Sequence, residues 1–453
     1  MSSSSLPLLP LFSLISLFSL SSAYTTTLSL SPTAEAPPHA NPWQRLAHLA
    51  SASFSRAHHL KQPKSNLSAS RVPLFPRGYG GYSISLSFGT PPQTSSFIMD
   101  TGSSLLWFPC TQRYSCNSCN FADIDPANIT TFIPKSSSTA KIVGCKNPKC
   151  KWIFPNVRCR ECDKSCNQAC PPYIIQYGSG STTGLLLSDS LVLPDQKVEN
   201  FVVGCSIFSN RQPAGIAGFG RGPESLPAQM KLKLFSYCLV SHRFDGKPVS
   251  SDLVLDSGGG AAGGGGIKYT PFRKNPASSN AAFQDYYYVT LRKITVGGVK
   301  VKAPYKFLVP DSDGRGGTIV DSGTTFTYME KEVFSVVAEE FEKQIGKNYS
   351  RAAAVEKESG LRPCYNISGE KTVDLPRLTF HFKGGAKMAL PLADYFSFVD
   401  ESVICITIVS SSGMEDGIGP GPAIILGNYQ QQNFYLEYDL ENERLGFRSQ
   451  RCK

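Results

Sequence analysis

The sequence has few features of a membrane-spanning, nucleic-acid-binding or metal-dependent protein. After its first residues, no stretch reaches the roughly 18 uninterrupted apolar residues of a membrane-spanning helix. The net charge is +10, but Lys and Arg are scattered singly and in pairs, so we expect no nucleic-acid partner. No cluster of His and Glu indicates a catalytic metal, and we expect no cofactor. Charged residues make up only 18% and hydrophobic residues 41%, which excludes a disordered chain.

Two further catalytic devices are missing. The sequence has no Gly-x-Ser-x-Gly turn, and beyond residue 77 it has only two His, His242 and His381, so a Ser-His-Asp hydrolase is disfavoured. The run 258–266 contains only Gly and Ala and lacks the Lys-Ser/Thr of a phosphate-binding loop. We expect this run to belong to a flexible connector over residues 257–283.

Residues 1–23 have the composition of a secretory signal peptide. They carry no charged side chain, are rich in Leu, Ser and Phe, and end in the small residues Ser21-Ser22-Ala23. The apolar run is short and broken by Pro and Ser, which disfavours a membrane anchor. We therefore expect a secreted protein without a membrane span, in the apoplast or cell wall, with the vacuole as the alternative.

The next stretch, residues 24–77, is basic. It carries six Lys or Arg against one acid, together with four of the six His. Apolar spacing predicts a short helix over Trp43–His58. This stretch is either a solvated linker or a basic prosegment that lies over an acidic cleft. Removing residues 1–77 leaves a net charge of +5, which suggests weak association with anionic cell-wall polysaccharide.

The 14 cysteines indicate an oxidising compartment. Nine of them lie between Cys110 and Cys170, and two C-x-x-C pairs there have the spacing of zinc knuckles. We favour disulfides over a structural metal, because thiolates meeting an oxidant cross-link first. Glycosylation sequons, typical of surface loops in a secreted protein, begin at Asn66, Asn128, Asn348 and Asn366.

Beyond residue 77 the pattern is predominantly β. Short β-type runs separated by Gly and Pro turns include 82–88, 185–193, 286–296 and 379–382. An apolar stripe predicts a helix over Glu330–Ile345, and a weaker one falls at Ser225–Leu234. We expect an all-β fold with few short helices: an N-terminal β lobe over 78–256 with a Cys-rich insert, and a C-terminal β lobe over 284–453.

An internal repeat carries most of the information about function. Ile-Met-Asp100-Thr-Gly-Ser-Ser recurs 221 residues later as Ile-Val-Asp321-Ser-Gly-Thr-Thr. A later apolar element ending in Gly also recurs in the same order, at 214–218 and 423–427. A single Asp-Thr-Gly is an ordinary turn, but two copies in matching contexts predict two homologous lobes that each donate one Asp.

Two such carboxylates facing each other across a pseudo-dyad have a definite chemistry. Like charges in close proximity cannot both ionise readily, so the pair shares a proton and titrates as a unit. The ionised partner can deprotonate a water while the protonated partner donates to a substrate carbonyl oxygen. The aspartic-protease dyad is the known example of this arrangement, applied here rather than derived.

On these residues the sequence resembles the pepsin-like aspartic proteases, and among them the plant nepenthesin-like group. Asp100-Thr-Gly-Ser-Ser-Leu-Leu-Trp107 and Asp321-Ser-Gly-Thr-Thr look like the two catalytic motifs, and Tyr177-Gly178-Ser looks like the substrate-covering flap. The Cys-rich stretch resembles the insert of the plant group. The resemblance covers residues 78–453 and implies a bilobal pepsin-like fold with the active-site cleft between its lobes.

The resemblance also implies a role for each matching residue. Asp100 and Asp321 would be catalytic. Thr101 and Ser322 would cross-link the loops, and Ser103 and Thr324 would bond the outer carboxylate oxygens. Tyr177 would cover the cleft and Trp107 would orient its phenol. The remaining loop and flap positions are Gly102, Gly323 and Gly178.

The function favoured by these features is an endopeptidase that binds extended protein or peptide substrates, with an acid pH optimum and as a monomer. One alternative is a catalytically inactive, protease-like binding protein that inhibits cell-wall glycosidases. Both Asp motifs and the flap Tyr are present, which favours the enzyme. A two-carboxylate glycosidase is disfavoured, because such enzymes place their carboxylates in unlike surroundings.

Overall fold

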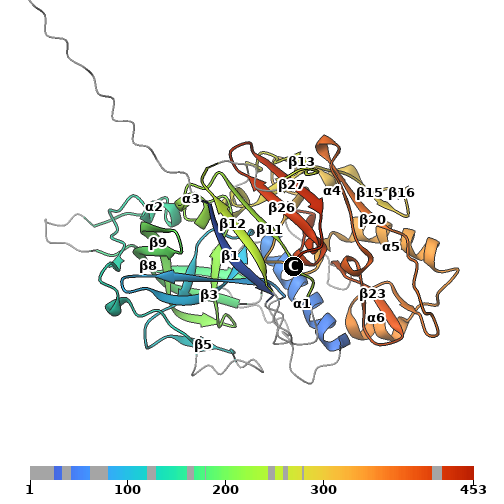
Figure 1. Ribbon diagram of the computed structural model, residues 1–453, viewed down its shortest axis with the longest axis horizontal. Coiled ribbons are helices and arrows are strands. Elements are labelled where there is room, and N and C mark those ends of the chain that lie inside the picture. Colours follow the sequence, from blue (N-terminus) through green and yellow to red (C-terminus); the bar gives the residue numbers. More distant parts are fainter. Residues whose placement is uncertain are drawn as a thin grey trace, which may run out of the picture.

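The computed structural model describes residues 25–32, 42–61, 80–119, 129–160, 168–178, 180–242, 250–258, 264–277, 280–410 and 421–453. The expected signal peptide and the sequons at Asn66 and Asn128 lie outside these residues. The described chain is mostly β and forms two lobes, with the N-terminal lobe in blue to green and the C-terminal lobe in yellow to red in Figure 1. The expected all-β, bilobal pepsin-like fold is confirmed.

The N-terminal lobe is one large, strongly paired sheet. Its longest strands, β8 and β9, form an antiparallel ribbon that supports the shorter strands around it. The strands of this lobe are β2 (Tyr82–Phe88), β3 (Gln93–Asp100), β4 (Trp107–Pro109), β5 (Ser115–Asn117), β6 (Lys141–Ile142), β7 (Tyr173–Tyr177), β8 (Gly180–Leu193), β9 (Gln196–Asn210) and β10 (Gly215–Gly218).

The C-terminal lobe divides its strands among three smaller sheets. Its core is apolar and closes around the longest helix of this lobe, which packs one face inward. The strands are β14 (Tyr287–Val289), β15 (Leu291–Val296), β16 (Val299–Lys300), β17 (Thr318–Val320), β18 (Thr327–Met329), β19 (Cys364–Asn366), β20 (Leu378–Phe382), β21 (Lys387–Ala389), β22 (Phe396–Phe398), β23 (Val403–Ile406), β24 (Ile408–Ser410) and β25 (Ile424–Leu426).

A third group of strands joins the two lobes in one continuous sheet. Strands from the middle of the chain pair directly with strands near its end, as β11 does with β26. The amino-terminal strand β1 inserts between β12 and β2, so the basic stretch is built into the fold. These strands are β1 (Thr25–Pro32), β11 (Leu234–Cys238), β12 (Ser251–Asp256), β13 (Lys268–Pro271), β26 (Phe434–Asp439) and β27 (Arg444–Ser449).

Helices are few, as expected. The longest, α1, lies between the two lobes (Figure 1) and contacts β7 of the first lobe and β18 and β24 of the second. The helices are α1 (Pro42–Lys61), α2 (Cys150–Ile153), α3 (Leu226–Gln229), α4 (Tyr305–Leu308), α5 (Lys331–Ile345) and α6 (Ala353–Ser359). Short 3-10 turns lie at Pro134–Ser136, Ala281–Gln284, Lys383–Gly385, Leu392–Asp394 and Asn428–Gln431.

The repeat seen in the sequence is a repeat of strand pairing. In the first lobe β10 runs parallel to β3 and antiparallel to β4. In the second lobe β25 runs parallel to β17 and antiparallel to β18. The two apolar elements that end in Gly are therefore the central strands of two equivalent three-strand units. Each unit holds one Asp motif at the carboxyl end of its first strand.

Most predicted elements are confirmed, with shifted bounds. The strand at 82–88 and the helix at 330–345 match β2 and α5 within one residue, and the helix predicted at 43–58 extends to Lys61. The helix predicted at 225–234 is wrong beyond Gln229, because Leu234 already begins β11, which pairs with β12 and β26. The single strand predicted at 286–296 is divided into β14 and β15, which belong to different sheets.

All twelve cysteines in the described part of the chain form disulfides. Within the insert, Cys116 bonds to Cys119, while Cys159 bonds to the distant Cys145, so neither C-x-x-C pair of the sequence holds a metal as a unit. The pair Cys238–Cys452 ties the first half to the end of the chain. The other pairs are Cys110–Cys205, Cys150–Cys170 and Cys364–Cys405. Among the described residues, no helix has both the length and the apolarity needed to cross a membrane.

Candidate active site

Two aspartates lie at the ends of equivalent buried strands. Asp100 is the last residue of β3 and Asp321 directly follows β17; their exposed fractions are 2% and 0%. After each aspartate the loop turns at a Gly whose backbone N–H donates to the carboxylate two residues earlier. Gly102 N lies 2.9 Å from Asp100 Oδ1, and Gly323 N lies 2.9 Å from Asp321 Oδ1. The two loops therefore fix their carboxylates by the same local bond.

A hydroxyl holds the second oxygen of each carboxylate. Ser103 Oγ donates to Asp100 Oδ2 at 2.6 Å, and Thr324 Oγ1 donates to Asp321 Oδ2 at 2.5 Å. Hydrogen bonds from a hydroxyl and a backbone N–H favour the ionised form of a carboxyl group and so lower its pKa. Each loop thus supplies the donors that a buried carboxylate needs.

The two loops are joined by a reciprocal set of bonds. Thr101 Oγ1 accepts from Ser322 N at 2.9 Å and donates to the carbonyl of Val320 at 3.2 Å. In the mirrored arrangement, Ser322 Oγ accepts from Thr101 N at 3.1 Å and donates to the carbonyl of Met99 at 2.9 Å. These hydroxyl-to-backbone bonds are the ones expected from the resemblance. They fix the lateral position of one loop relative to the other.

Both carboxylates reach a single common group, the guanidinium of Arg56. Nη2 of Arg56 lies 2.6 Å from Asp100 Oδ1, and Nε lies 3.2 Å from Asp321 Oδ2. Two residues that are 221 positions apart in the sequence are thereby brought within hydrogen-bonding distance of one side chain. The two carboxylates therefore lie close enough together to share one small hydrogen-bonding group.

Close packing beneath each loop explains the repeated glycines. A Cβ added at Gly218 would lie 2.1 Å from the carbonyl oxygen of Ser104, and one added at Gly427 would lie 2.4 Å from that of Thr325. Only glycine allows the central strands β10 and β25 to approach the loops this closely. The internal repeat therefore preserves a packing requirement in both lobes.

The hairpin of β7 and β8 carries the aromatic residue expected to cover the site. Tyr177 ends β7, and its hydroxyl accepts a 2.7 Å hydrogen bond from Trp107 Nε1, at the start of β4. Trp107 is fully buried and Tyr177 is 7% exposed. Burial, together with the charge of Asp100, raises the pKa of Tyr177 well above its usual value, so the phenol stays neutral.

Family models and known proteins match most of the chain. Family models described as xylanase inhibitor N-terminal and C-terminal match residues 82–251 and 286–449. A probable aspartyl protease from Arabidopsis thaliana is 34% identical over 423 residues, 82% of each chain. Nepenthesin-2 from Nepenthes gracilis, an aspartic proteinase, is 34% identical over 388 residues, 83% of this chain and 78% of the relative.

The chain belongs to the nepenthesin-like group of plant pepsin-like aspartic proteases. Solved structures show the same fold at lower identity. The soybean basic 7S globulin has a TM-score of 0.62 and 16% identity, and covers 94% of this chain and 95% of its own. An EDGP structure has a TM-score of 0.63 and 17% identity, with the same coverage.

The aspartates of this nepenthesin-like protein differ in acidity. Burial raises the pKa of Asp100 to about 6, with the charge of Asp321 acting in the same direction and that of Arg56 opposing both. Burial also favours protonation of Asp321, but the Arg56 charge and the hydrogen bond from Thr324 outweigh it, so its pKa falls below the usual value. The pair therefore titrates as one unit in which Asp321 is the more acidic member.

Helix α1 occupies the site through its Arg56 end. A Cβ added at Gly178 would lie 2.3 Å from the Arg56 Cα, so the turn after Tyr177 rests directly on this helix and has no room for a side chain. The His59 ring lies 6.4 Å from the Tyr177 ring, and burial together with the Arg56 charge lowers the pKa of His59 to about 3. His59 is therefore neutral beside the flap.

Apolar contacts and a second ion pair hold the rest of α1. Leu46, Leu49 and Leu60 are buried in one cluster with aromatic residues of the C-terminal lobe. The Lys61 ammonium, 1% exposed, bonds to the carboxylate of Glu330 and to the carbonyl of Pro422 at 3.1 Å. Burying a leucine side chain stabilises a structure by roughly 1.5–3 kcal/mol.

Sequence reasoning missed Arg56 and Lys61 as individual residues. It identified the basic composition of residues 24–77, but that count does not distinguish Arg56 from the five other basic residues. One usable signal exists. In the helix predicted at 43–58, Arg56 lies seven residues after Leu49, two turns further on the apolar face that must pack against the lobes.

Other predicted residues lie outside the site. Asn348 and Asn366 are exposed, one after α5 and one at the end of β19, which is compatible with the surface location expected of their sequons. His242 is buried, and its Nε2 lies 3.3 Å from Asn428 Oδ1; burial lowers its pKa to about 4. His381 lies on β20, where Nε2 is 3.0 Å from Thr295 Oγ1. Each of these hydrogen bonds joins a His to a polar side chain other than the two aspartates.

Proposed function

We propose that this protein is the precursor of an aspartic endopeptidase that hydrolyses peptide bonds with a water molecule held between Asp100 and Asp321. The observation that carries the proposal is the convergence of both carboxylates on one small group, Arg56, from loops that retain every expected hydrogen-bond donor. Inactive relatives of such a fold need not keep this complete set, since binding alone does not require a shared proton.

The mechanism follows from the unequal acidity of the pair. The ionised aspartate accepts a proton from the bound water as its oxygen attacks the carbonyl carbon of the substrate, and the protonated aspartate donates its proton to the carbonyl oxygen. We propose Asp321 for the first role and Asp100 for the second, because Asp321 is the more acidic member of the pair while Arg56 is docked. Breakdown of the tetrahedral intermediate then transfers the proton held by Asp321 to the leaving amine nitrogen, while Asp100 takes a proton back from a hydroxyl of the intermediate, and the two peptide products depart.

The substrate is an extended segment of protein. Strand-like peptides gain affinity through their backbone hydrogen bonds, and side-chain pockets supply the preference. Tyr177 and the hairpin of β7 and β8 cover the bound peptide, with Trp107 fixing the orientation of the phenol. No cofactor or metal takes part, and the enzyme acts as a monomer.

The test is digestion of denatured haemoglobin at pH 3–5 by the purified, acid-treated protein, followed by a peptide-library digest. We expect cleavage that pepstatin blocks and that the Asp321→Asn variant lacks. An absence of cleavage by wild-type protein whose amino-terminal segment has been removed would contradict the proposal. So would cleavage that persists in the variant.

We further propose that residues 24–77 are an inhibitory prosegment of a secreted zymogen, following the signal peptide at 1–23. Arg56 occupies the position between the aspartates that the water would need. The charge of Arg56 favours the ionised form of both aspartates, so protonation of either carboxylate removes one of the ion pairs that hold the helix. Acid therefore favours undocking, and docking weakens as the pH falls. The apolar contacts of α1 remain, so removal is completed by cleavage of the chain.

The test of the prosegment is incubation of the purified full-length chain at pH 4 and at pH 7. We expect shortening of the amino terminus and a gain in activity at pH 4 alone. Equal stability of the full-length chain at both pH values would argue against acid-triggered maturation. Mass spectrometry of the secreted protein tests the proposed glycans on Asn348 and Asn366.

The alternative function is inhibition of cell-wall glycosidases. It is favoured by one observation: the matching family models carry the description of a xylanase inhibitor. A titration of xylanase with the purified protein distinguishes the two functions. Stoichiometric inhibition without any peptide cleavage would support the binding protein, and cleavage without inhibition would support the enzyme.

A further inference from the structure

The positive charge of the chain is distributed unevenly once residues 1–77 are set aside. The Cys-rich insert between Cys110 and Cys170 has nine basic and four acidic residues, a net charge of +5. The rest of the chain beyond residue 77 is neutral in sum. The described part of the insert at 129–160 contains seven Lys or Arg and no acid. The net charge therefore belongs to one small module and not to the surface as a whole.

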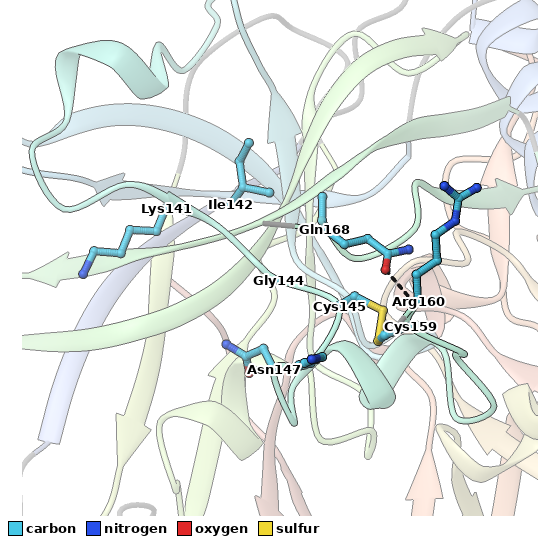
Figure 2. Close-up of a pocket in the computed structure, with 10 residues that line it drawn as sticks. Lys141, Ile142, Gly144, Cys145, Asn147, Cys159, Arg160 and Gln168 are labelled. Carbon is cyan, nitrogen blue, oxygen red and sulfur yellow. Dashed lines mark hydrogen bonds between the residues drawn. A yellow bond between two sulfur atoms is a disulfide. The ribbon is translucent and has the colours of Figure 1, made fainter. Parts of the chain in front are cut away.

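This module contains a cavity of about 510 Å³, within the size range of small-ligand sites. Its lining includes three cations, two amide side chains and the disulfide between Cys145 and Cys159. Lys141 comes from β6, and Arg160 follows the second cysteine of that disulfide. Figure 2 shows these two side chains at opposite ends of the drawn set, with Gln168 and the disulfide between them. The positive charges are thus spaced along the cavity instead of converging on one point.

The lining is held in place by covalent and backbone bonds. Gln168 Oε1 accepts a 2.9 Å hydrogen bond from Arg160 N, which fixes the amide next to the disulfide (Figure 2). Cys145 N donates to the Gln168 carbonyl at 2.8 Å, and the Gly144–Ala169 bridge joins the two sides of the cavity. The backbone of the site is therefore preorganised, while the exposed Lys141, Lys146 and Arg160 side chains are ordered only when a ligand binds.

We propose that this cavity of the Cys-rich insert binds an acidic polysaccharide whose sugar rings carry carboxylates, a polyuronide. Spaced cations match a chain with one charge on each repeating unit better than a compact anion such as phosphate. The amide oxygens of Asn147 and Gln168 already accept from Lys149 N and Arg160 N, which leaves their NH2 groups to donate to sugar hydroxyls or carboxylates. No aromatic side chain is among the residues that line the cavity, so the stacking platform of a nucleic-acid site is missing from it.

The cavity is separate from the proposed catalytic site. Helix α2, next to Asn147 in the sequence, lies at the outer end of the N-terminal lobe, whereas α1 lies between the lobes (Figure 1). A bound polysaccharide would therefore leave the aspartates accessible and would hold the protein in an anionic matrix. Because the attraction is between exposed charges, it weakens as salt is added.

The experiment is affinity chromatography of the full-length protein on immobilised polygalacturonate at pH 5.5 over a series of NaCl concentrations. The test variant combines Lys141→Gln, Lys146→Gln and Arg160→Gln. The matched control removes the same charges from exposed positions of the C-terminal lobe: Arg292→Gln, Lys300→Gln and Lys302→Gln. We expect the test variant to bind about tenfold more weakly at low salt. The control should elute with the wild type, and fully methyl-esterified polygalacturonate should retain none of the proteins.

Three results would overturn the proposal. Equal losses in the test and control variants would mean that only net charge matters. Unchanged retention of the test variant would mean that the cavity is not involved. Tighter retention on poly-glutamate than on polygalacturonate, lost in the test variant, would assign the cavity to an acidic peptide. Cleavage of a short peptide by each acid-treated variant shows that the fold is intact, and this activity should match wild type.

Discussion

The two catalytic loops make the same internal hydrogen bonds but have different surroundings. Gly102 and Ser103 serve Asp100 as Gly323 and Thr324 serve Asp321. Yet the pKa of Asp100 is raised to about 6 and that of Asp321 is lowered. Both carboxylates are equally buried, so the difference arises from the charges and donors around them: the charge of Asp321 raises the pKa of Asp100, while Arg56 and the Thr324 hydroxyl together outweigh burial at Asp321. Duplication of a motif therefore produces two carboxylates, and their environment makes them unequal.

The next residue in each loop shows the same divergence. Ser104 Oγ accepts from Gly222 N at 3.0 Å, within the N-terminal half of the chain. At the equivalent position Thr325 Oγ1 donates to the carbonyl of Gly80 at 2.8 Å, across the two halves. The second loop is thus bonded to the start of the N-terminal lobe, while the first loop is bonded to a residue of its own half of the chain. Symmetry holds for the inner bonds and fails one residue further out.

The most severe way to break this comparison is to neutralise one carboxylate at a time. Asp100→Asn and Asp321→Asn should each lower kcat/KM for a peptide substrate by at least about a thousandfold, because acid and base are both required. Asp313→Asn, in an exposed loop of the C-terminal lobe, is the matched control and should leave the rate unchanged. A single variant that retains a tenth of the activity would show that the pair does not act as a unit.

Removing the shared cation tests the pair in the docked state. Arg56→Gln leaves two buried carboxylates facing each other, and loss of one partner of a buried ion pair costs roughly 3–5 kcal/mol. We expect the amino-terminal segment of the variant to be lost at least about tenfold faster at pH 6.5, measured by gel densitometry. Arg56→Lys keeps the charge without the two-pronged geometry and should give an intermediate rate. A rate no faster than wild type in Arg56→Gln would contradict the inhibitory role of this contact.

The sequence predicts the two aspartates tested here, but it does not predict their shared partner, Arg56. The repeat around Asp100 and Asp321 predicts two lobes and two loops, because the residues that form each turn, and the glycines that allow close packing, follow one another in the sequence. The partner of both carboxylates comes from a helix more than forty residues earlier, and its choice of Arg56 depends on how α1 packs against the lobes. Composition alone shows only that the stretch is basic.

The same limit explains the errors in secondary structure. The run at 286–296 contains no Gly or Pro and is rich in β-branched and aromatic residues, and nothing local shows that Thr290 separates strands of two different sheets. The helix predicted at 225–234 has a genuine start, since Ser225 Oγ accepts from Ala228 N. It ends early because Leu234 pairs with Asp256 and Asp439, both distant in sequence. Long-range pairing overrides local propensity in each case.

A smaller effect is expected from the bonds that join the loops. Thr101→Ala and Ser322→Ala each leave a buried backbone N–H without its acceptor, which costs about 1–3 kcal/mol of unfolding free energy. Because the bonds are reciprocal, the two losses should be similar, and the double variant should lose less than their sum. Urea denaturation measures this, with Thr101→Ser and Ser322→Thr as controls that restore the hydroxyl. Strongly unequal losses would show that one loop alone determines the geometry.

The mildest test changes the acidity of one carboxylate and leaves its charge. Ser103→Ala removes a donor that favours ionised Asp100, so its pKa rises, and the alkaline limit of the pH–rate profile should move to higher pH. Thr324→Ala raises the pKa of Asp321 in the same way, and because Asp321 must be ionised to accept a proton, the acid limit should move to higher pH. Both should change the maximal rate only a few-fold, and Ser103→Thr and Thr324→Ser should restore the wild-type limits. If Ser103→Ala moved the acid limit instead, the two aspartates would have exchanged roles, and the asymmetry argued from the docked state would not survive removal of Arg56.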